Sequence, residues 1–204
     1  MLKNSYQDEL IEAGCDEAGR GCYAGPVFAA AVILPQNFFH PLLNDSKQVS
    51  VNDRNELRPI IETSAIAFGV AMVCHEEIDR INILRASFKA MHLALDQLKT
   101  RPKLLLIDGN RFTRYKRVAH RCIVQGDATY ASIAAASILA KTWRDQYMQD
   151  LHEEFPHYNW HTNKGYGTQE HRNAIEKFGL CKYHRKSFNI APARDAEIQI
   201  PLLD

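Results

Sequence analysis

The chain has 204 residues, with 25 Lys and Arg against 24 Asp and Glu, which leaves a formal net charge of +1. Its hydrophobic content of 46% and charged content of 24% are those of a soluble globular protein, and they exclude a wholly disordered chain, a collagen-like chain and a coiled coil. The length favours one domain that is large enough to fold without disulfides or a structural metal.

The cysteines and the apolar runs indicate a reducing compartment. The five cysteines are an odd number and none are spaced as Cys-x-x-Cys, so we expect no disulfide framework. The first residues are polar and acidic, unlike a signal peptide, and the longest apolar run is Val27 to Leu34, whereas a membrane span needs about 20 residues. We therefore expect a cytoplasmic monomer with no membrane association.

The first half of the chain predicts strands and then a helix. Three segments, Leu10–Cys15, Val27–Leu34 and Ser64–Val73, have the composition of strands, and we expect them to be neighbours joined by short connections. From Glu76 to Leu98 the apolar residues recur every three or four positions, which predicts a helix.

The second half predicts two short strands and two helices. The strands cover Leu104–Ile107 and His120–Gln125, and each is closed by turn-forming residues. A long helix rich in small residues is predicted over Ala128–Phe155, and a last helix over Thr168–Phe178 with Gly179 as its C-terminal cap. The order of elements predicts an α/β fold in which helices pack on a mixed sheet.

Acidic residues follow three of the predicted strands. Asp16 and Glu17 follow the first strand, Asp108 follows Leu104–Ile107, and Asp127 follows the strand that ends near Gln125. Sites in open α/β sheets form at strand ends, so these carboxylates converge if the first strand is central and lies beside the strand that ends at Asp108. Converging carboxylates repel one another unless divalent cations neutralise them, and two such ions about 3.5–4 Å apart catalyse in-line phosphodiester displacement.

Ordinary structural explanations remain for some of these acids. The run Asp108-Gly109-Asn110 also fits a simple turn, and Asp127 also fits the N-cap of the helix that follows it. The adjacent pair Asp16-Glu17, which leaves an apolar strand, is harder to explain in structural terms alone.

The glycines after the first strand allow two interpretations. Residues 19–24 fit a loose Gly-x-Gly-x-x-Ala pattern, which would indicate dinucleotide binding and an oxidoreductase. Against this, Pro26 and an apolar run follow where a phosphate-facing helix should begin. Alternatively, the glycines allow close approach of the backbone to a ligand, with Arg20 facing a phosphate or a sugar.

Basic residues are concentrated in two segments. Residues 101–121 hold seven Lys and Arg and one acid, and residues 157–190 hold six against two glutamates. Such segments are compatible with a polyanionic partner, although charge alone favours an ordinary solvated surface.

The most specific signal is a series of short blocks between residues 10 and 190. In chain order they are Cys15–Gly21 with Ala24–Val27, Leu43–Lys47, Ile107–Asn110, Gly126–Asp127 with Ser132–Lys141, His161–Thr168, and His184–Phe188. Together these blocks resemble the ribonuclease HII family, the type 2 ribonucleases H.

The resemblance implies a ribonuclease H-like fold, with a five-stranded mixed sheet flanked by helices. It implies one catalytic domain over residues 1–190, followed by a tail over residues 191–204. The implied activity is hydrolysis of the RNA strand of RNA–DNA hybrids and cleavage 5′ of single ribonucleotides in duplex DNA. The mechanism would use two metal ions, Mn²⁺ or Mg²⁺, and leave 3′-hydroxyl and 5′-phosphate ends. The alternative is a catalytically weak hybrid-binding module on the same fold.

The resemblance also implies roles for individual residues. Four carboxylates would bind the metal ions and carry catalysis, namely Asp16, Glu17, Asp108 and Asp127. Gly19, Arg20 and Gly21 would sense the 2′-hydroxyl, which distinguishes RNA from DNA, and the adjacent phosphate. Tyr166, which would otherwise be an ordinary half-buried tyrosine, would pack on the sugar at the RNA–DNA junction, and the DNA-strand backbone would contact Ser46 and Lys47.

Three positions depart from the family pattern. Gln125 stands where Lys is usual, Trp143 where Thr is common, and Tyr23 where Leu is common. Asp145 matches a family aspartate, but an ion pair with Lys141 four residues earlier explains it, so we leave it out of the site.

The C-terminal tail contains a candidate partner motif. Gln199, Ile200, Leu202 and Leu203 resemble the bacterial sliding-clamp-binding pattern Gln-Leu-x-Leu-Phe. A peptide with such apolar anchors can dock in a hydrophobic groove, which would make a sliding clamp a partner. The alternatives are a tail that packs on its own domain or one that is frayed.

Overall fold

A computed structural model describes residues 2–44 and 48–190 of the chain. The predictions for Ser46 and Lys47, and those for the tail over residues 191–204, lie outside the described residues.

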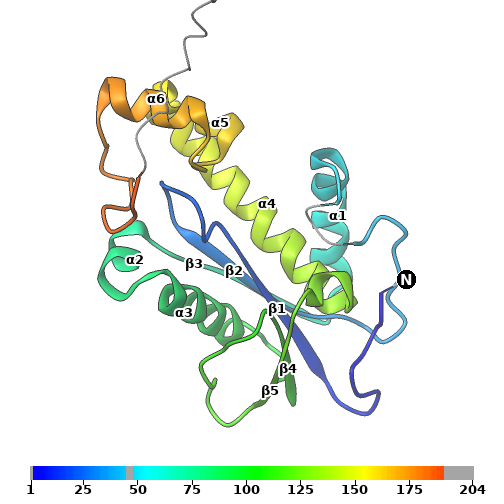
Figure 1. Cartoon of the computed structure of the whole chain (residues 1–204). Helices are drawn as coiled ribbons and strands as arrows, with labels where there is room; N and C mark the ends of the chain where they lie inside the picture. Colours follow the sequence, from blue (N-terminus) through cyan, green and yellow to red (C-terminus); the bar gives the residue numbers. More distant parts are fainter. Residues whose placement is uncertain (1, 45–47, 191–204) are drawn as a thin grey trace, which may run out of the picture.

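The structure is built on a single mixed sheet. Its strands are β1 (Glu12–Ala18), β2 (Val27–Ile33), β3 (Ala67–Val73), β4 (Leu104–Asp108) and β5 (Ala119–Ile123). Their order across the sheet is β3-β2-β1-β4-β5, so the first strand is central (Figure 1). The β1–β2 and β2–β3 pairs are antiparallel, whereas the β1–β4 and β4–β5 pairs are parallel. This arrangement confirms the predicted five-stranded mixed sheet, with the first strand beside the one that ends at Asp108.

Helices cover both faces of the sheet. They are α1 (Val51–Ser64), α2 (His75–Ile81), α3 (Ile83–Asp96), α4 (Ala131–Glu154), α5 (Trp160–Asn163) and α6 (Gln169–Phe178). Helix α4 crosses one face and α3 lies on the other, while α5 and α6 gather at the far end of α4 (Figure 1). None of the helices in the described part of the chain is both long and apolar enough to cross a bilayer.

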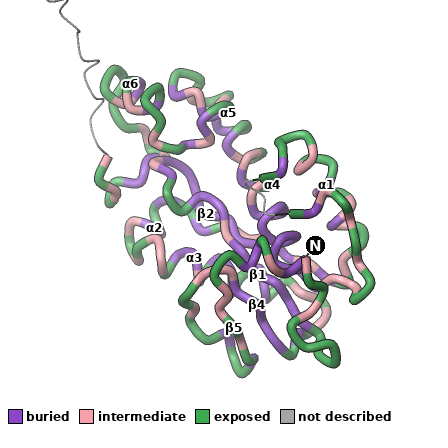
Figure 2. Tube along the Cα trace, turned by 45° about the vertical axis from the view of Figure 1, so that its right-hand side comes forward, coloured by how far each residue is buried: buried purple, intermediate pink, exposed green. Residues whose placement is uncertain are grey.

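The alternation of side chains along β1 divides the core into two layers. Ala13 and Cys15 belong to the cluster that packs under α3, while Gly14 contacts α4 on the opposite face. Figure 2 shows β1, β2 and β4 largely buried, whereas β5 at the sheet edge is more exposed. Asp16 shares the α4 face with Gly14, so the fold directs this carboxylate inward.

Helix α1 lies between the second and third strands, so the short connection that we expected there is wrong. Only Leu57 and Ile61 of this helix are buried, and Pro59 interrupts its pattern, so helical periodicity is weak. The helix nevertheless has an N-cap residue of a favoured type, Ser50, whose hydroxyl accepts a hydrogen bond from the Asp53 N–H at 3.2 Å.

Two helix boundaries differ from the prediction, and one helix is confirmed. The helix predicted over Glu76–Leu98 is two helices, because Asn82 has a left-handed φ of 68° and its side chain caps α3 by accepting from the Arg85 N–H. Helix α4 begins at Ala131 after a 3₁₀ turn, η1 (Gly126–Ala128), so Asp127 is not its N-cap. Helix α6 has the predicted caps, Thr168 and Gly179.

Replacement of Gly14 by alanine tests the close contact between β1 and α4. A Cβ at this position would lie 2.2 Å from the Ser132 carbonyl carbon and 2.3 Å from the Ile133 nitrogen, which are backbone atoms. We expect Gly14→Ala to lower the free energy of unfolding by about 1–3 kcal/mol or more, measured by urea denaturation. Gly21→Ala is the matched control, because no atom lies within 4 Å of its Cβ position. Equal stability of the two variants would contradict the prediction.

Candidate metal centre and substrate cavity

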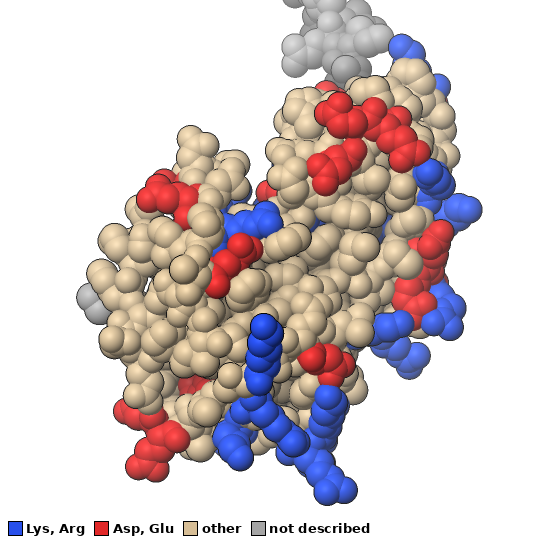
Figure 3. Space-filling view, turned by 180° about the vertical axis from the view of Figure 1, so that it is seen from behind, with Lys and Arg blue, Asp and Glu red and all other residues tan. Residues whose placement is uncertain are grey.

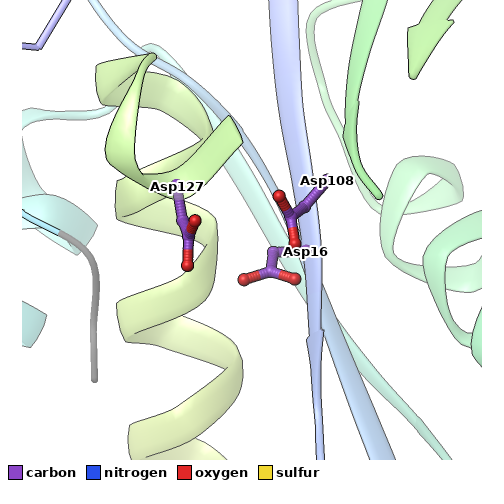
Figure 4. Close-up of side chains that lie close together, drawn as sticks. All are labelled: Asp16, Asp108 and Asp127. Atoms are coloured by element: carbon purple, nitrogen blue, oxygen red, sulfur yellow. The ribbon is translucent and has the colours of Figure 1, made fainter. Parts of the chain in front are cut away.

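Three carboxylates from three elements converge at the ends of the central strands. Asp16 lies on β1, Asp108 is the last residue of β4, and Asp127 lies in η1. One carboxylate oxygen of each lies within 4.8 Å of the other two (Figure 4). The parallel register pairs Cys15 with Ile107, so the next residue of each strand, Asp16 or Asp108, faces α4.

Backbone and side-chain donors fix the orientation of these carboxylates. Asp108 Oδ1 accepts a hydrogen bond from the Gly126 N–H at 2.8 Å, which ties the end of β4 to the turn that carries Asp127. Asp127 Oδ1 accepts from the Ala128 N–H at 3.0 Å. Asp16 accepts from the Glu17 N–H at 2.7 Å and from the Ser137 side chain. The cluster is therefore held by the framework of the fold.

The electrostatics of the cluster favour a bound cation. Asp16 is 6% exposed and Asp127 is 3% exposed. Burial raises the pKa of Asp16 well above its ordinary value, the charges of Glu17 and Asp108 raise it further, and the hydrogen bonds from Ser137 and the Glu17 N–H oppose the shift. Buried carboxylate oxygens at this spacing fit a hard divalent cation such as Mg²⁺ or Mn²⁺.

Glu17, the fourth predicted carboxylate, is not one of the three acids whose oxygens lie within 4.8 Å of one another, although it lines the same cavity as Asp16 and Asp108. It follows Asp16 on the strand, so the alternation of side chains directs it to the other face of β1. Its Oε1 accepts a hydrogen bond from Arg20 Nη1 at 2.9 Å. The structure thus brings three of the four predicted carboxylates together, and the role of Glu17 as a metal ligand stays a prediction.

Asp16 and Asp108 of the cluster, together with Glu17, line a cavity of about 290 Å³. Strand-end acids form one wall, the loop after β1 forms another, and basic residues and a tyrosine complete the lining. The lining residues are Asp16, Glu17, Ala18, Gly19, Arg20, Gly21, Arg54, Asp108, Ser137, Lys141 and Tyr166. The predicted substrate residues that the structure describes, namely Gly19, Arg20, Gly21 and Tyr166, therefore share one cavity with the carboxylates of Asp16, Glu17 and Asp108, whereas Asp127 is not among its lining residues.

Tyr166 is tied to the loop after β1 through its backbone. It forms an isolated bridge with Cys22, and the Tyr23 N–H donates to the Gly165 carbonyl at 2.7 Å. The Tyr166 carbonyl accepts from His171 Nδ1 at 2.9 Å. The side chain is 40% exposed, and burial raises the pKa of its phenol, so the hydroxyl remains a hydrogen-bond donor at neutral pH.

The site prediction missed three lining residues, Arg54, Ser137 and Lys141. Ser137 and Lys141 stand four residues apart on one face of α4, and this spacing within a recognised block was an available signal. Arg54 lies on α1, the helix that the sequence pattern did not reveal. The predicted ion pair between Lys141 and Asp145 is present, and Asp145 does not line the cavity.

The three departures from the family pattern have different surroundings. Gln125 is exposed, and its left-handed φ of 55° begins the turn that carries Asp127. The indole of Trp143 lies outside the cavity lining, with the Arg58 guanidinium carbon 4.0 Å from its ring centre. The ring of Tyr23 packs on Gly167, where a Cβ would lie 2.4 Å from it, so this residue contacts the backbone next to Tyr166.

The architecture defines the ribonuclease H-like fold, and solved structures share it. The ribonuclease H2 from Pyrococcus horikoshii OT3 matches with a TM-score of 0.73 at 23% identity, covering 88% of this chain and 94% of that one. The ribonuclease HII of a complex with PCNA from Archaeoglobus fulgidus matches with a TM-score of 0.71 at 23% identity, covering 89% and 96%. At such identities these likenesses establish the fold.

The family follows from the sequence comparisons. The sequence model of the family named Ribonuclease HII matches residues 13–191. Ribonuclease HII of Phocaeicola vulgatus is 58% identical over 201 residues, which cover 98% of this chain and 100% of that protein. The chain belongs to the ribonuclease HII family, and it is therefore a metal-dependent ribonuclease that acts on RNA–DNA hybrids.

Replacement of Asp16 by asparagine separates the metal site from the stability of the fold. The folded protein holds the proton of Asp16 more tightly than the unfolded chain does, so metal-free protein loses stability as pH rises above about 4. We expect metal-free Asp16→Asn to be at least as stable as the original protein at pH 7, because it removes a buried charge. Mn²⁺ should raise the melting temperature of the original protein and have a much smaller effect on the variant, measured by calorimetry.

The control for this experiment is Asp150→Asn, which changes an exposed carboxylate elsewhere on α4. It should keep the full response to Mn²⁺. An equal rise in melting temperature with Mn²⁺ for Asp16→Asn and Asp150→Asn would contradict the assignment of the cluster as the metal site.

Proposed function

We propose that the protein cuts on the 5′ side of single ribonucleotides embedded in duplex DNA, in addition to cutting the RNA strand of hybrids. The proposed products are 3′-hydroxyl and 5′-phosphate ends. One observation carries the proposal, which is that the strand-end carboxylates and the candidate 2′-hydroxyl-sensing loop line the same cavity. A single ribonucleotide can therefore meet both sets of residues at once.

The proposed chemistry uses two divalent cations, Mn²⁺ or Mg²⁺, held by Asp16, Asp108 and Asp127 together with Glu17. Bound cations of this kind supply an activated water and stabilise the leaving oxygen, so no covalent protein nucleophile is required. The convergence of the three aspartates supports this proposal. Arg54 and Lys141 add positive charge to the cavity, where they would attract the scissile phosphate and hold it in line with the carboxylates.

The proposed recognition of the ribose depends on the loop after β1. At Gly21 no atom lies within 4 Å of the Cβ position, so the backbone there leaves room for a sugar to approach. Arg20 lies close enough to Glu17 for a hydrogen bond, which places a phosphate-binding side chain next to a carboxylate. The half-exposed ring of Tyr166 would pack on the sugar at the junction. We propose that Ser46 and Lys47 contact the DNA strand, as the family resemblance implies.

The structure does not favour the dinucleotide-binding alternative. Residues 19–26 lead into strand β2, whereas a pyrophosphate site of that kind needs the N-terminus of a helix. The predicted metal-binding carboxylates are all present, which argues against a catalytically weak binding module.

Exposed basic residues are concentrated on and around strands β4 and β5. The seven Lys and Arg residues between positions 101 and 121 are all exposed. Figure 3 shows Lys and Arg side chains gathered at the lower end of the molecule, where β4 and β5 lie in Figure 1. We propose that this surface follows the phosphate backbone of the duplex beyond the cavity, which would make binding salt-dependent.

The direct test is cleavage of a labelled DNA duplex that carries one ribonucleotide. We expect a cut on its 5′ side with Mn²⁺ or Mg²⁺, none with chelator, and none in an all-DNA duplex. Asp108→Asn should lower kcat by about 10³-fold, because a lost metal ligand removes several kcal/mol of transition-state stabilisation. Duplex binding should survive, and Asp150→Asn should remain active. Near-full activity of Asp108→Asn would refute its proposed role.

We also propose that the C-terminal tail binds a sliding clamp through Gln199, Ile200, Leu202 and Leu203. The likeness of these residues to the clamp-binding pattern supports the proposal. The related ribonuclease HII from Archaeoglobus fulgidus was solved in a complex with PCNA, which supports such a partner for this chain.

A peptide of residues 191–204 should bind a bacterial sliding clamp, and removal of residues 198–204 should abolish clamp capture by the full protein. Cleavage without clamp should be unchanged by this truncation. The matched control is a peptide with Leu202 and Leu203 replaced by alanine, since apolar anchors supply the affinity. Absence of affinity in the original peptide, together with unchanged capture by the truncated protein, would exclude clamp binding by the tail.

A further inference from the structure

Two arginines are buried beneath the substrate loops. Arg144 on α4 is 1% exposed and Arg185, beyond α6, is 0% exposed. Within the described residues neither guanidinium pairs with a carboxylate, although buried charges in proteins are usually paired. Groups other than carboxylates must therefore compensate for the burial of these two guanidinium groups.

Backbone carbonyl groups take the place of acidic partners. Arg185 donates to the carbonyls of Gly19 at 2.7 Å, Arg20 at 2.8 Å and Gly25 at 2.9 Å. The planar guanidinium presents several N–H donors in a fixed fork, so one side chain holds three points of the loop at once.

Arg144 joins the same loop to the segment that carries the tyrosine. It donates to the carbonyls of Ala24 at 3.1 Å, Pro26 at 3.0 Å and Lys164 at 2.8 Å. Through one side chain, residues 24–26 and the residues just before Tyr166 are fixed to α4.

Arg144 also contacts the substrate-facing residues closely. Gly19 has a φ of +93°, and a Cβ there would lie 2.0 Å from Arg144 Nε. The Arg144 guanidinium carbon lies 5.9 Å from the centre of the Tyr166 ring. Burial lowers the pKa of Arg185 to about 10, so this guanidinium still keeps its charge and all its donors at neutral pH.

The loops that these arginines hold have little other means of satisfying their carbonyls. Irregular segments normally lie on the surface, where water accepts and donates hydrogen bonds. Here the carbonyls of Gly19, Ala24 and Gly25 point inward to side-chain donors. Loss of these donors would leave buried acceptors unsatisfied, so the loops would move toward water.

We propose that Arg144 and Arg185 are positioning residues that hold the Gly19–Gly21 loop and Tyr166 at a fixed spacing, and that this spacing determines the recognition of a single 2′-hydroxyl. The inference rests on the proposed cleavage at single ribonucleotides. A continuous RNA strand offers a 2′-hydroxyl in every register, whereas a single ribonucleotide must meet both elements in one register. Greater mobility of the loops therefore lowers cleavage at a single ribonucleotide more than cleavage of a continuous RNA strand.

Arg185→Lys tests the proposal, because lysine keeps the charge and loses the planar fork. We expect kcat/KM for a duplex with one ribonucleotide to fall about 10²-fold, the cost of a misplacement of about 1 Å, and kcat/KM for a long RNA–DNA hybrid to fall at most about tenfold. Arg144→Lys should act in the same direction. The rise in melting temperature with Mn²⁺ should be unchanged, since neither arginine touches the carboxylate cluster.

Tyr158→Phe is the matched control for a purely structural effect. It removes the partly buried hydrogen bond, 2.7 Å long, from the hydroxyl of the buried Tyr158 to the Gly179 carbonyl, and this bond does not involve the substrate loops. This variant should lose stability without changing the ratio of the two kcat/KM values. If Arg185→Lys leaves that ratio unchanged as well, the arginines are structural only and the proposal is overturned.

Hydrogen exchange separates this proposal from the proposed function. If the original protein cuts hybrids but not single ribonucleotides, the proposed function fails, and the amides of Tyr23 and Tyr166 still report positioning. They should exchange faster in Arg185→Lys while β4 is unchanged, and equal exchange would overturn the proposal. If neither lysine variant folds, the exchange rates of the Tyr23 and Tyr166 amides in the unmutated protein test the proposal. Exchange as slow as that of the β1 amides would support it, and fast exchange would contradict it.

Discussion

The parallel pairing of β1 with β4 is the constraint on which the rest of the site depends. Because Cys15 pairs with Ile107, two carboxylates of like charge, Asp16 and Asp108, are brought side by side on a buried face. In the absence of a cation, charge repulsion and desolvation both disfavour two ionised carboxylates at this position. The pKa of Asp16 is raised for these same two reasons. The surrounding core has to outweigh these two effects, and the two strands that carry these acids are accordingly buried over most of their length. A divalent cation would convert the same repulsion into binding free energy.

Close packing of α4 on the sheet makes this arrangement possible. Small residues line the contact from both sides, with Gly14 and Ala30 on the strands and Ala134 and Ala135 on the helix. The approach is so close that no side chain fits at Gly14, and it brings Ser137 within reach of Asp16. The alanine-rich composition of this helix is thus a requirement of the site, because larger residues would hold its cationic and hydroxyl groups away from the carboxylates.

How far the sequence predicts the molecule depends on whether a feature leaves a local pattern. The strands and the final helix have periodicity, turn residues and caps, and the acids near the carboxyl ends of apolar strands reveal a shared edge once β1 is placed in the centre. Helix α1 escaped because two buried residues make a weak pattern, and the break at Asn82 because one left-handed residue does not disturb the apolar spacing. Glu17 is adjacent to Asp16 in sequence and lines the same cavity, but it is not one of the three acids whose oxygens lie close together, so its role as a metal ligand stays a prediction. Arg185 lies within one of the recognised blocks, but no sequence pattern revealed the contacts of Arg144 and Arg185, because their partners are backbone carbonyls, which every residue carries.

The acidic and the basic side chains of the site have different kinds of partner. The clustered acids fit divalent cations, whereas the buried arginines have partners in the backbone of the substrate loops. Strand β1 joins the two parts, since it carries Asp16 and continues through Ala18 directly into Gly19. A hydrogen-bonded strand is a stiff connection, so the spacing between the cluster and the loop is set by the sheet as well as by the arginines. An enzyme that must cut at a defined phosphate next to one 2′-hydroxyl needs such a fixed spacing, because the register of cleavage is the distance between the group that is recognised and the bond that is broken.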